Sequence, residues 1–293
     1  MTRLPHPISY QGSKRSQAGR ITNYLRSLPA RPRTLYEPFA GSAAVTLAAA
    51  HLNLAAHFRL GDALAPLVGI WRKVVEDPTD LADRYQALWT AQLGNEAPYY
   101  LHIRDAFNTD QDPAKLLYLM ARCVKNAVRF NREGRFNQSP DHRRKGTRPD
   151  KMRAALFGAH ELLRGRTACA ALDYDVMLEG ATAADVVYLD PPYQGTSGSR
   201  DQRYVQSLDL GRFVLSLEAL NRRNVPFIVS FDGRCGAKAY GAALPPELGL
   251  LHTEIEVGRS SQATLNGRAE VTVESLYVSR QFGDAHPSFN PQS

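Results

Sequence analysis

The stretch TLYEPFAGSAAVTLAAAHLN, residues 34–53, decides the fold. An apolar start, a tight turn of small residues and an Ala-rich run are typical of a β-strand, a turn and an α-helix in succession. The pattern then repeats, because a second strand ending in HFRLGD, residues 57–62, leads into the helical run ALAPLVGIWRKVVED, residues 63–77. Two successive strand–helix units predict the opening of a parallel α/β sheet.

The α/β pattern resumes after residue 150. Three runs of strand character are TACAALDY, DVVYLDPPY and PFIVSFDG, at residues 167–174, 185–193 and 226–233, and a helical run at 209–223 precedes the third. Two β-rich pieces near the end of the sequence are suited to antiparallel pairing at the sheet edge. The sequence therefore predicts a doubly wound α/β sheet.

Residues 78–150 interrupt this pattern with helices and no clear strand. Helices are predicted over residues 80–93, 97–107 and 112–131. Asp112 is placed to cap the last of these, with Pro113 at its first helical position. We therefore predict a sheet domain built from residues 1–77 and 151–293, with residues 78–150 as a helical insertion.

Positive charge is concentrated in the same insertion. The formal net charge of the chain is +7, and residues 122–153 hold eleven Lys or Arg against three Asp or Glu, a local balance of +8. A segment of this kind suits a polyanion, because neutralised phosphates release their condensed counterions. The alternative is a basic face that is merely solvated.

Composition narrows the class of protein further. The 293 residues are 43% hydrophobic, which is enough for a large core. No stretch approaches the ~20 apolar residues that span a bilayer, and MTRLPHPISY lacks the apolar core of a secretion signal, so we expect a cytoplasmic protein without a membrane partner. The three cysteines and eight histidines show no ligand spacing, and no metal is predicted.

Polar and small residues follow each predicted strand of the sheet. In a doubly wound sheet the ligand site lies outside the carboxyl ends of the strands, where the strand order switches. We therefore expect one cleft to be shared by four groups of residues: Phe39, Ala40, Gly41, Ser42 and Ala43; Asp62; Asp173 and Tyr174; and Asp190, Pro191, Pro192 and Tyr193.

Three of these groups predict a cofactor that contains a nucleoside. The small residues of EPFAGSAAV let backbone approach a ligand, although they also suit a turn packed tightly for steric reasons. Asp62 stands where a carboxylate accepts hydrogen bonds from ribose hydroxyls, a role compatible with capping the next helix. Asp173 can accept from an adenine amino group while Tyr174 packs on the ring, the alternative being a polar loop residue beside a core tyrosine.

The tetrapeptide DPPY, residues 190–193, carries the strongest chemical signal. An aromatic amine is a poor nucleophile because its lone pair is delocalised into the ring. Two acceptors aimed at its protons favour the localised form and stabilise developing positive charge. Proline fixes that geometry in advance, and the ring of Tyr193 can stack on a base rotated out of a duplex.

DPPY resembles the signature of amino-directed DNA methyltransferases, and the chain from Ile8 to Phe282 resembles the Dam-like, D12-class DNA adenine methyltransferases. SYQGSKR is similar to the family's amino-terminal cofactor loop, which brings Tyr10, Gly12, Ser13 and Lys14 to the cofactor. EPFAGSAAV resembles the family's AdoMet loop. RFNREGRFNQSP, residues 129–140, is similar to the hairpin that the family inserts into DNA, with Arg129, Asn131, Gly134, Phe136 and Asn137 in pattern.

The resemblance implies a Rossmann-like class I AdoMet-dependent methyltransferase sheet with a target-recognition insertion. It implies transfer of a methyl group from S-adenosyl-L-methionine to the exocyclic amine of a flipped adenine in double-stranded DNA, the activity of EC 2.1.1.72. Asp190 would orient the amine. The protein would act either alone or with a cognate restriction endonuclease that cuts the same site. The predicted DNA-binding residues are Arg129, Asn131, Arg132, Arg135, Asn137, Arg143, Arg144 and Lys145.

Two positions depart from the family pattern. Ser13 stands where many relatives have a second Gly, and Ala43 replaces the last Gly of the FxGxG form. Both residues are small, so close approach of a ligand survives, but an alanine at positive φ is strained. We expect the affinity for the cofactor to be adjusted rather than lost.

Other functions are compatible with parts of the sequence. The same tetrapeptide chemistry suits the cytosine amino group, or adenine in RNA. A nicotinamide-dependent oxidoreductase uses a similar sheet, but GxGxxG is missing after the first strand. An intact Asp190–Tyr193 segment argues against a DNA-binding module without catalysis. Asp232 can line a base pocket, or it can serve a turn.

Overall fold

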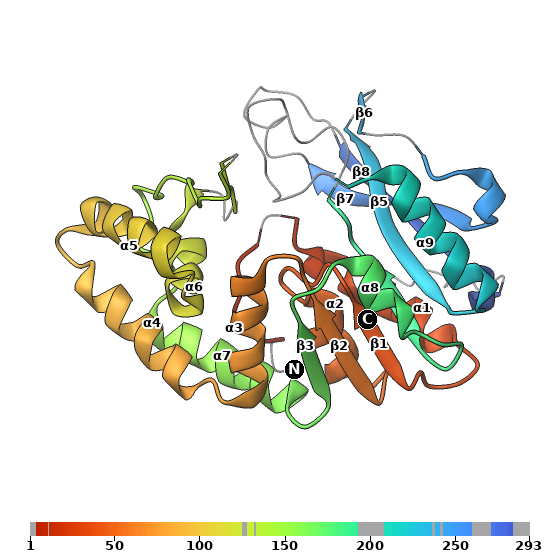
Figure 1. Cartoon of the computed structure of the whole chain (residues 1–293), viewed down its shortest axis with the longest axis horizontal. Coiled ribbons are helices and arrows are strands. Elements are labelled where there is room, and N and C mark those ends of the chain that lie inside the picture. The colour runs from red at the N-terminus through yellow and green to blue at the C-terminus, as the bar shows by residue number, and fades with distance from the viewer. Residues whose placement is uncertain are drawn as a thin grey trace.

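The computed structural model describes residues 4–10, 12–124, 128–131, 133–192, 208–235, 238–240, 243–259 and 271–283. One sheet runs through these residues in the order β3-β2-β1-β4-β5-β8-β7, and β6 pairs with β5 (Figure 1). Neighbours from β3 to β5 are parallel, which confirms the predicted α/β fold. The strands are β1 (Thr34–Glu37), β2 (His57–Gly61), β3 (Thr167–Ala170), β4 (Val186–Leu189), β5 (Phe227–Cys235), β6 (Lys238–Tyr240), β7 (Leu251–Arg259) and β8 (Val271–Val278).

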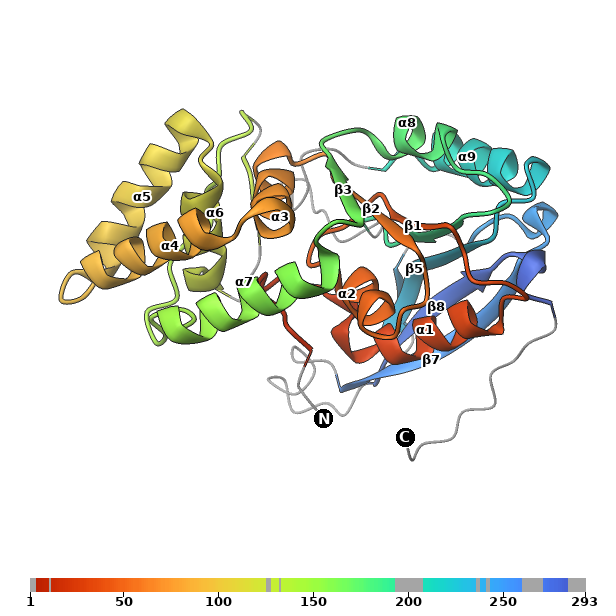
Figure 2. The ribbon, with the colours of Figure 1, turned by 90° about the horizontal axis from the view of Figure 1, so that it is seen from below.

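Helices cover both faces of the sheet. Figure 2 shows α1 and α2 on one face and α8 and α9 on the other. The α-helices are α1 (Ala18–Ser27), α2 (Ala44–His51), α3 (Ala65–Glu76), α4 (Thr79–Ala91), α5 (Glu96–Asp110), α6 (Pro113–Arg122), α7 (Pro149–Leu163), α8 (Tyr174–Glu179) and α9 (Leu210–Arg222). Short 3-10 helices span Lys14–Ser16, Pro246–Leu248 and Arg280–Phe282.

The central strand β4 supplies side chains to two separate hydrophobic cores. Val186 and Tyr188 belong to the core that includes residues of α1 and α2, whereas Val187 and Leu189 belong to the core that includes residues of α8 and α9. All four side chains are fully buried. Successive residues of a strand point to opposite faces, so the apolar run of four satisfies both cores at once.

The helices α4, α5 and α6 lie to one side of the sheet, beyond α3 (Figure 1). Their buried residues, among them Tyr85, Tyr100 and Phe107, are continuous with the core under α1 and α2. In the part of residues 78–150 that the structure describes, short connections join these helices, isolated β-bridges follow α6, and there is no strand. The boundaries of the insertion remain a prediction.

Helix α6 begins as the sequence predicts but ends early. Asp112 accepts a hydrogen bond from the backbone N–H of Ala114 at 2.8 Å, and Pro113 opens the helix. The predicted helix to residue 131 is wrong, because α6 ends at Arg122. Cys123 takes an extended conformation and bridges Pro140 in antiparallel fashion. Pairing with the returning chain therefore replaces helical bonding from that point.

Two strand predictions are modified by the structure. The β-rich pieces near the end do pair antiparallel as β7 and β8, but β8 lies inside the sheet between β5 and β7. The strand predicted to run to Tyr174 ends at Ala170, because Tyr174 already begins α8. Strand β5 continues to Cys235, so Asp232 lies within a strand, and its side chain lies outside the described structure. No helix among the described residues is long and apolar enough to cross a membrane.

Candidate active site

The site lies where the strand order switches, between β1 and β4. These two strands are parallel neighbours, and from them the sheet grows in opposite directions, through β2 on one side and β5 on the other. The chain leaves β1 into the turn at Phe39 and leaves β4 at Asp190. Such a switch point is where ligands bind in doubly wound sheets.

Asp190 forms an ion pair with Lys14 at the centre of this region. Lys14 Nζ lies 2.8 Å from Asp190 Oδ1, and the two side chains are 4% and 20% exposed. Burial raises the pKa of Asp190 to about 6, because the positive charge of Lys14 opposes that effect only in part. The pair therefore joins the amino-terminal loop to the end of β4.

A second carboxylate, Glu274 on β8, also faces Lys14. Its Oε2 atom lies 3.6 Å from Lys14 Nζ and accepts a hydrogen bond of 2.6 Å from Gln17 Nε2. Burial alone would lower the pKa of Lys14, but the charges of Asp190 and Glu274 raise it above its ordinary value. Sequence reasoning missed Glu274, although it shares a strand face with the buried Leu276 and Val278, where an acid is unusual.

The turn after β1 is held by three side chains. Gly41 has φ +48°, and its carbonyl oxygen accepts a 3.0 Å hydrogen bond from Trp71 Nε1. Its N–H donates to Asp62 Oδ2 at 3.2 Å, while Asp62 Oδ1 accepts from the N–H of Leu64 at 3.0 Å. The ring of Tyr10 lies beside Gly41, where an added Cβ would meet its Cδ1 at 3.6 Å. Burial raises the pKa of Asp62, although backbone N–H donors, Ala63 among them, oppose the rise.

The two cofactor loops predicted from the sequence are in contact. Ser13 Oγ and Ser42 Oγ are 2.7 Å apart, which is hydrogen-bonding distance. The serine that departs from the family pattern at position 13 therefore contacts the turn after β1. Gly12, beside it, has φ +86° and open space where a side chain would be.

The strain expected at Ala43 is present. Ala43 caps α2 with φ 48° and ψ 35°, in the left-handed region, and its side chain is fully buried. Left-handed backbone costs an L-residue roughly 1–2 kcal/mol.

Replacement of Ala43 by Gly should relieve this strain. We expect Ala43→Gly to raise the free energy of unfolding by up to ~1 kcal/mol, because glycine adopts positive φ at little cost while losing one buried methyl group. Urea titration followed by circular dichroism measures it. Ala48→Gly, in the interior of α2, is the control and should destabilise. Equal losses in both variants would contradict the strain.

Glu37, the last residue of β1, is a second buried acid that sequence reasoning missed. It is 3% exposed, and its Oε2 atom accepts a 3.0 Å hydrogen bond from the N–H of Thr46 in the first turn of α2. Burial raises the pKa of Glu37 to about 8 despite this bond, and the charge of Asp190 adds to the rise. Near neutral pH Glu37 is therefore mainly protonated, and Asp190 is the charged acid.

An aromatic cluster lies beside the turn after β1. Phe39 stacks on Tyr174 with ring centroids 5.2 Å apart, and Tyr174 meets Phe213 edge-on at 5.7 Å. Burial raises the pKa of Tyr174 to about 12. Phe39 and Tyr174, each predicted to bind the cofactor, are thus brought together.

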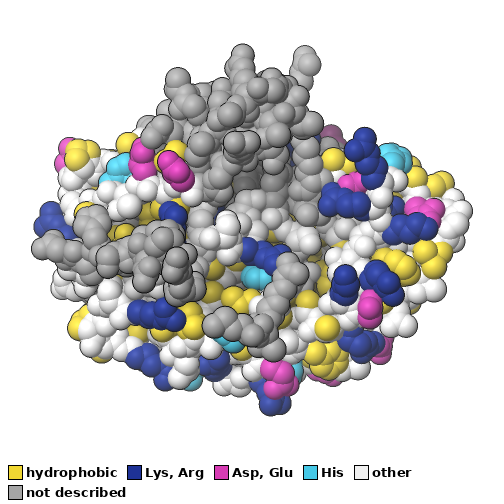
Figure 3. Space-filling view, turned by 180° about the vertical axis from the view of Figure 1, so that it is seen from behind, with side chains coloured by type: hydrophobic (Ala, Val, Ile, Leu, Met, Phe, Trp, Pro, Cys, Tyr) yellow, Lys and Arg dark blue, Asp and Glu magenta, His cyan; other side chains and the backbone are white. Residues whose placement is uncertain are grey.

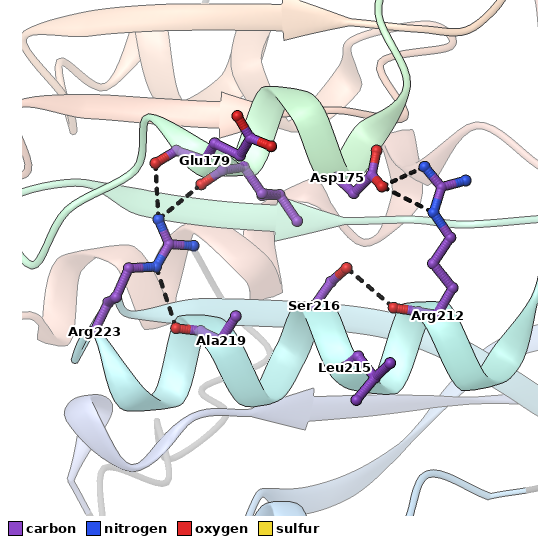
Figure 4. Close-up of a pocket in the computed structure, with 8 residues that line it drawn as sticks. Asp175, Glu179, Arg212, Leu215, Ser216, Ala219 and Arg223 are labelled. Atoms are coloured by element: carbon purple, nitrogen blue, oxygen red, sulfur yellow. Dashed lines mark hydrogen bonds and ion pairs between the residues drawn. The ribbon is translucent and has the colours of Figure 1, made fainter.

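Asp173 is engaged by the protein itself. Arg212 of α9 lies 3.1 Å from its Oδ2 atom and also packs over the ring of Tyr174. Figure 4 shows the groove between α8 and α9, in which Arg212 binds Asp175 and Arg223 donates to backbone carbonyls of α8. One carboxylate oxygen of Asp173 is therefore occupied by Arg212.

The predicted hairpin at Glu133 and Gly134 is confirmed. Phe130 and Phe136 form an antiparallel bridge, and Gly134 has φ +73°, as a tight turn requires. The side chain of Asn131 accepts hydrogen bonds from the N–H groups of Glu133 and Arg135 at 3.1 and 2.9 Å. Asn131 therefore shapes the turn.

The hairpin is anchored to α5 through contacts of Asn108 and Phe107 with Phe136. Asn108 Nδ2 donates to the carbonyl of Phe136 at 2.9 Å, and Asn108 Oδ1 accepts from its N–H at 2.7 Å. The Phe136 ring meets Phe107 edge-on at 6.1 Å. At the tip and beyond it, Arg135 and Asn137 are exposed, and Arg129 is partly buried.

The backbone of the basic loop after the hairpin, residues 141–147, is also held by side chains of the helical segment. The buried Arg122 donates to the carbonyl of Asp141 at 2.8 Å, Gln92 donates to that of Lys145 at 3.0 Å, and Tyr85 donates to that of Thr147 at 2.6 Å. Backbone held in this way projects its side chains outward. Figure 3, a view from behind, shows Lys and Arg side chains over the half of the molecule that the helical segment forms.

The exposed cations of this loop differ in their partners. Arg144 pairs with Asp141 at 2.6 Å, and Lys145 pairs with Glu96 at 2.7 Å. Arg143 is exposed beside them. Two of the predicted site residues, Tyr193 and Arg132, lie outside the described residues. No group of three His, Cys, Asp or Glu side chains that could hold a metal occurs among those described.

A buried Lys–Asp pair at the switch point of a parallel sheet, beside a small-residue turn and the basic residues 122–153, indicates an α/β protein with a ligand site at the switch point and a surface suited to a polyanion. Residues 10–214 match the family described as D12 class N6 adenine-specific DNA methyltransferase. The chain belongs to this family and is an adenine-specific DNA methyltransferase, EC 2.1.1.72.

Curated relatives agree with the family. The chain is 29% identical over 217 residues to the Retron Ec67 DNA adenine methylase of Escherichia coli, with 72% of each chain covered. It is 29% identical over 277 residues to a DNA adenine methylase of Salmonella typhi, covering 92% of this chain and 93% of the relative. Identity to a DNA N-6-adenine-methyltransferase of Escherichia phage P1 is 30%, over 60% of this chain and 22% of that longer protein. The oxidoreductase alternative is therefore set aside.

Proposed function

We propose that the protein transfers a methyl group from S-adenosyl-L-methionine to the exocyclic amine of an adenine rotated out of double-stranded DNA. The observation that carries this proposal is the carboxylate of Asp190 at the switch point, paired with Lys14 and followed by two prolines. Lys14 occupies Oδ1, and the proposal assigns Oδ2 to an N–H of the amine. The carbonyl of Pro191 is proposed as the second acceptor.

The residues at the switch point fit a sulfonium nucleoside. The Gly41 turn allows close approach of a ligand. Asp62 retains acceptor capacity beyond its backbone donors, and Phe39 with Tyr174 offers an apolar aromatic wall. When bound, S-adenosyl-L-methionine supplies an electrophilic methyl carbon, and the balanced products are N6-methyladenine, S-adenosylhomocysteine and one proton. Asp62 would hold the ribose, while Asp173 keeps one oxygen for an adenine edge.

In this proposal the chain contributes alignment and charge. Asp190 accepts from the amine, favours its localised lone pair, and takes the proton that leaves as the N–C bond forms. Good positioning alone can supply ~7–11 kcal/mol. Tyr193 is proposed to stack on the base, as an aromatic residue beside two prolines can do. Because the pKa of Asp190 is about 6, the rate should fall below that pH as the acceptor is protonated.

The decisive experiment identifies the methylated nucleoside. Purified protein is incubated with labelled S-adenosyl-L-methionine and unmethylated duplex DNA, single-stranded DNA or RNA, and the digested nucleosides are resolved by mass. We expect N6-methyldeoxyadenosine from duplex DNA. N4-methyldeoxycytidine, or methylation of RNA alone, would contradict the proposal. Sequencing of methylated positions in a host that expresses the protein then gives the target site.

We assign residues 78–150 to DNA recognition, and the exposed cations of the hairpin and basic loop support this role. We propose that phosphates or guanine edges are contacted by Arg129, Arg132 and Arg135. We propose that Asn131 and Asn137 shape or extend the hairpin. We propose that phosphates of the DNA backbone are bound by Arg143, Arg144 and Lys145. We also propose a cytoplasmic location. Action with a restriction endonuclease and action alone both fit this proposal.

Charge reversal should separate the two sets of cations. We expect Arg143→Glu with Arg144→Glu to weaken binding to cognate and unrelated duplexes by the same factor, about tenfold or more, and to flatten the salt dependence. Arg135→Ala should weaken binding to the cognate site alone, by ~1–3 kcal/mol. Fluorescence anisotropy at several salt concentrations measures both. Arg222→Glu on α9 is the control, and identical behaviour of the two sets would refute the division.

A further inference from the structure

We propose that Glu274 is a positioning residue. Its carboxylate attracts the ammonium group of Lys14, so that Lys14 holds only one oxygen of Asp190 and leaves the other for the amine. This inference rests on the proposed function and deepens it. Glu274 lies outside residues 10–214, the part of the chain that matches the family. It lies on β8, in the carboxyl-terminal part of the sheet, where neighbouring strands pair antiparallel.

The contacts of Lys14 support this role. Its ammonium group lies 2.8 Å from Asp190 Oδ1, 3.6 Å from Glu274 Oε2 and 3.4 Å from the carbonyl oxygen of Gly12. The Lys14 side chain is 4% exposed. A buried ammonium has three donors to satisfy, and these three oxygens are among the acceptors near it. Glu274 is thus a second carboxylate toward which the Lys14 ammonium group can point.

Glu274 is itself fixed. Gln17, only 3% exposed, donates to its Oε2 atom at 2.6 Å from the residue that precedes α1. On β8, Glu274 pairs in register with Ile255 of β7 and Gly233 of β5, so its backbone is held on both sides. A carboxylate held in this way can set the position of an ammonium group.

The charges around Asp190 act in opposite directions. Burial is the largest influence and raises the pKa of Asp190; Lys14 lowers this pKa by favouring the ionised carboxylate, and Glu274 raises it by disfavouring that form. Two further groups face the same region: Glu37 on β1, and Tyr188 on β4, whose hydroxyl bonds Ser230 at 2.8 Å. Of the two charges, that of Lys14 weakens Asp190 as a proton acceptor. Glu274 offsets part of that effect and keeps Asp190 able to take the proton that leaves the methylated amine.

The test is the pH dependence of single-turnover methyl transfer between pH 5 and 9. Lys14→Met should move the acid limb of the profile to higher pH, by roughly one unit or more, because an opposite charge is lost. Glu274→Gln should move it to lower pH, by about half a unit or more, because a like charge is lost. Gln17→Leu, which releases Glu274, should move it slightly in the same direction as Glu274→Gln.

The matched control is Glu256→Gln, which removes an exposed carboxylate on the neighbouring strand β7. It should leave the profile unchanged. Thermal melting and affinity for S-adenosyl-L-methionine, measured for each variant, show that the fold and the cofactor site are intact. A residue with only a structural role would lower the rate at all pH values without moving the limb.

The outcomes separate this inference from the proposed function. Absence of N6-methyladenine with the unmodified protein would refute the proposed function. Methylation by the unmodified protein, with the same limb in Glu274→Gln, would overturn the role of Glu274 alone. A limb that moves in the same direction in Lys14→Met and Glu274→Gln would also overturn it.

Discussion

Asp190→Ala should reduce single-turnover methyl transfer by about 10²–10⁴-fold, the range typical of a lost acid–base or charge-stabilising group. The variant removes the proposed acceptor of the amine. It also removes a carboxylate 2.8 Å from Lys14, which is 4% exposed, and leaves Glu274 at 3.6 Å. Equilibrium binding of S-adenosyl-L-methionine should change far less than the rate, because Asp190 is assigned to the base and not to the cofactor.

Asp190→Asn sharpens this test. Asparagine keeps the size of the side chain and one acceptor oxygen but has no negative charge and cannot take the proton. We expect its rate to lie well below that of the unmodified protein at every pH, without the acid limb near pH 6. Glu161→Ala, which removes an exposed carboxylate on α7, is the control and should retain the full rate. An unchanged rate in Asp190→Ala would remove Asp190 from the chemistry.

Glu37→Gln should reduce the loss of stability that accompanies a rise in pH. Burial raises the pKa of Glu37 from 4.5 to about 8, so between these values the folded protein retains a proton that the unfolded chain has lost. The free energy of unfolding therefore falls as pH rises through this window, by up to about 1.4 kcal/mol per unit from this group. Glutamine carries no such proton.

Urea unfolding at pH 5 and pH 8 measures this difference. We expect the fall in the free energy of unfolding between the two conditions to be smaller in Glu37→Gln by roughly 3–4 kcal/mol. Part of the fall should remain, because burial also raises the pKa of Asp62 and of Asp190. The control Glu256→Gln should keep the slope of the unmodified protein. Equal slopes in Glu37→Gln and the unmodified protein would show that Glu37 is ionised in the fold.

The sequence predicted those parts of the fold that short-range patterns determine. Apolar runs ending in Gly61 and Leu189, followed by polar residues, were sufficient to place Asp62 and Asp190 at strand ends. Asp112 and Pro113 likewise defined the start of α6. Such signals are local, because strand ends and helix caps depend on neighbouring residues.

Other features depend on residues far apart in the chain. Helix α6 ends at Arg122 because Cys123 pairs with Pro140, which no helical periodicity reveals. The partners of Lys14 lie 176 and 260 positions away, at Asp190 and Glu274. Only the order of strands in the sheet brings these residues together. The ion pair of Asp173 with Arg212 was hidden for the same reason.

The two-sided burial of β4 has a consequence for how this enzyme can diverge. Val186 and Tyr188 pack in one core while Val187 and Leu189 pack in the other, so a shift of the strand by a single residue would exchange every side chain between the cores. Asp190, which follows β4, can therefore change its depth only if the strand shifts by two residues, the period that returns each side chain to its own core. If residues 78–150 recognise DNA as proposed, substitutions there can change which DNA is modified, while the depth of Asp190 stays fixed by the fully buried side chains of β4.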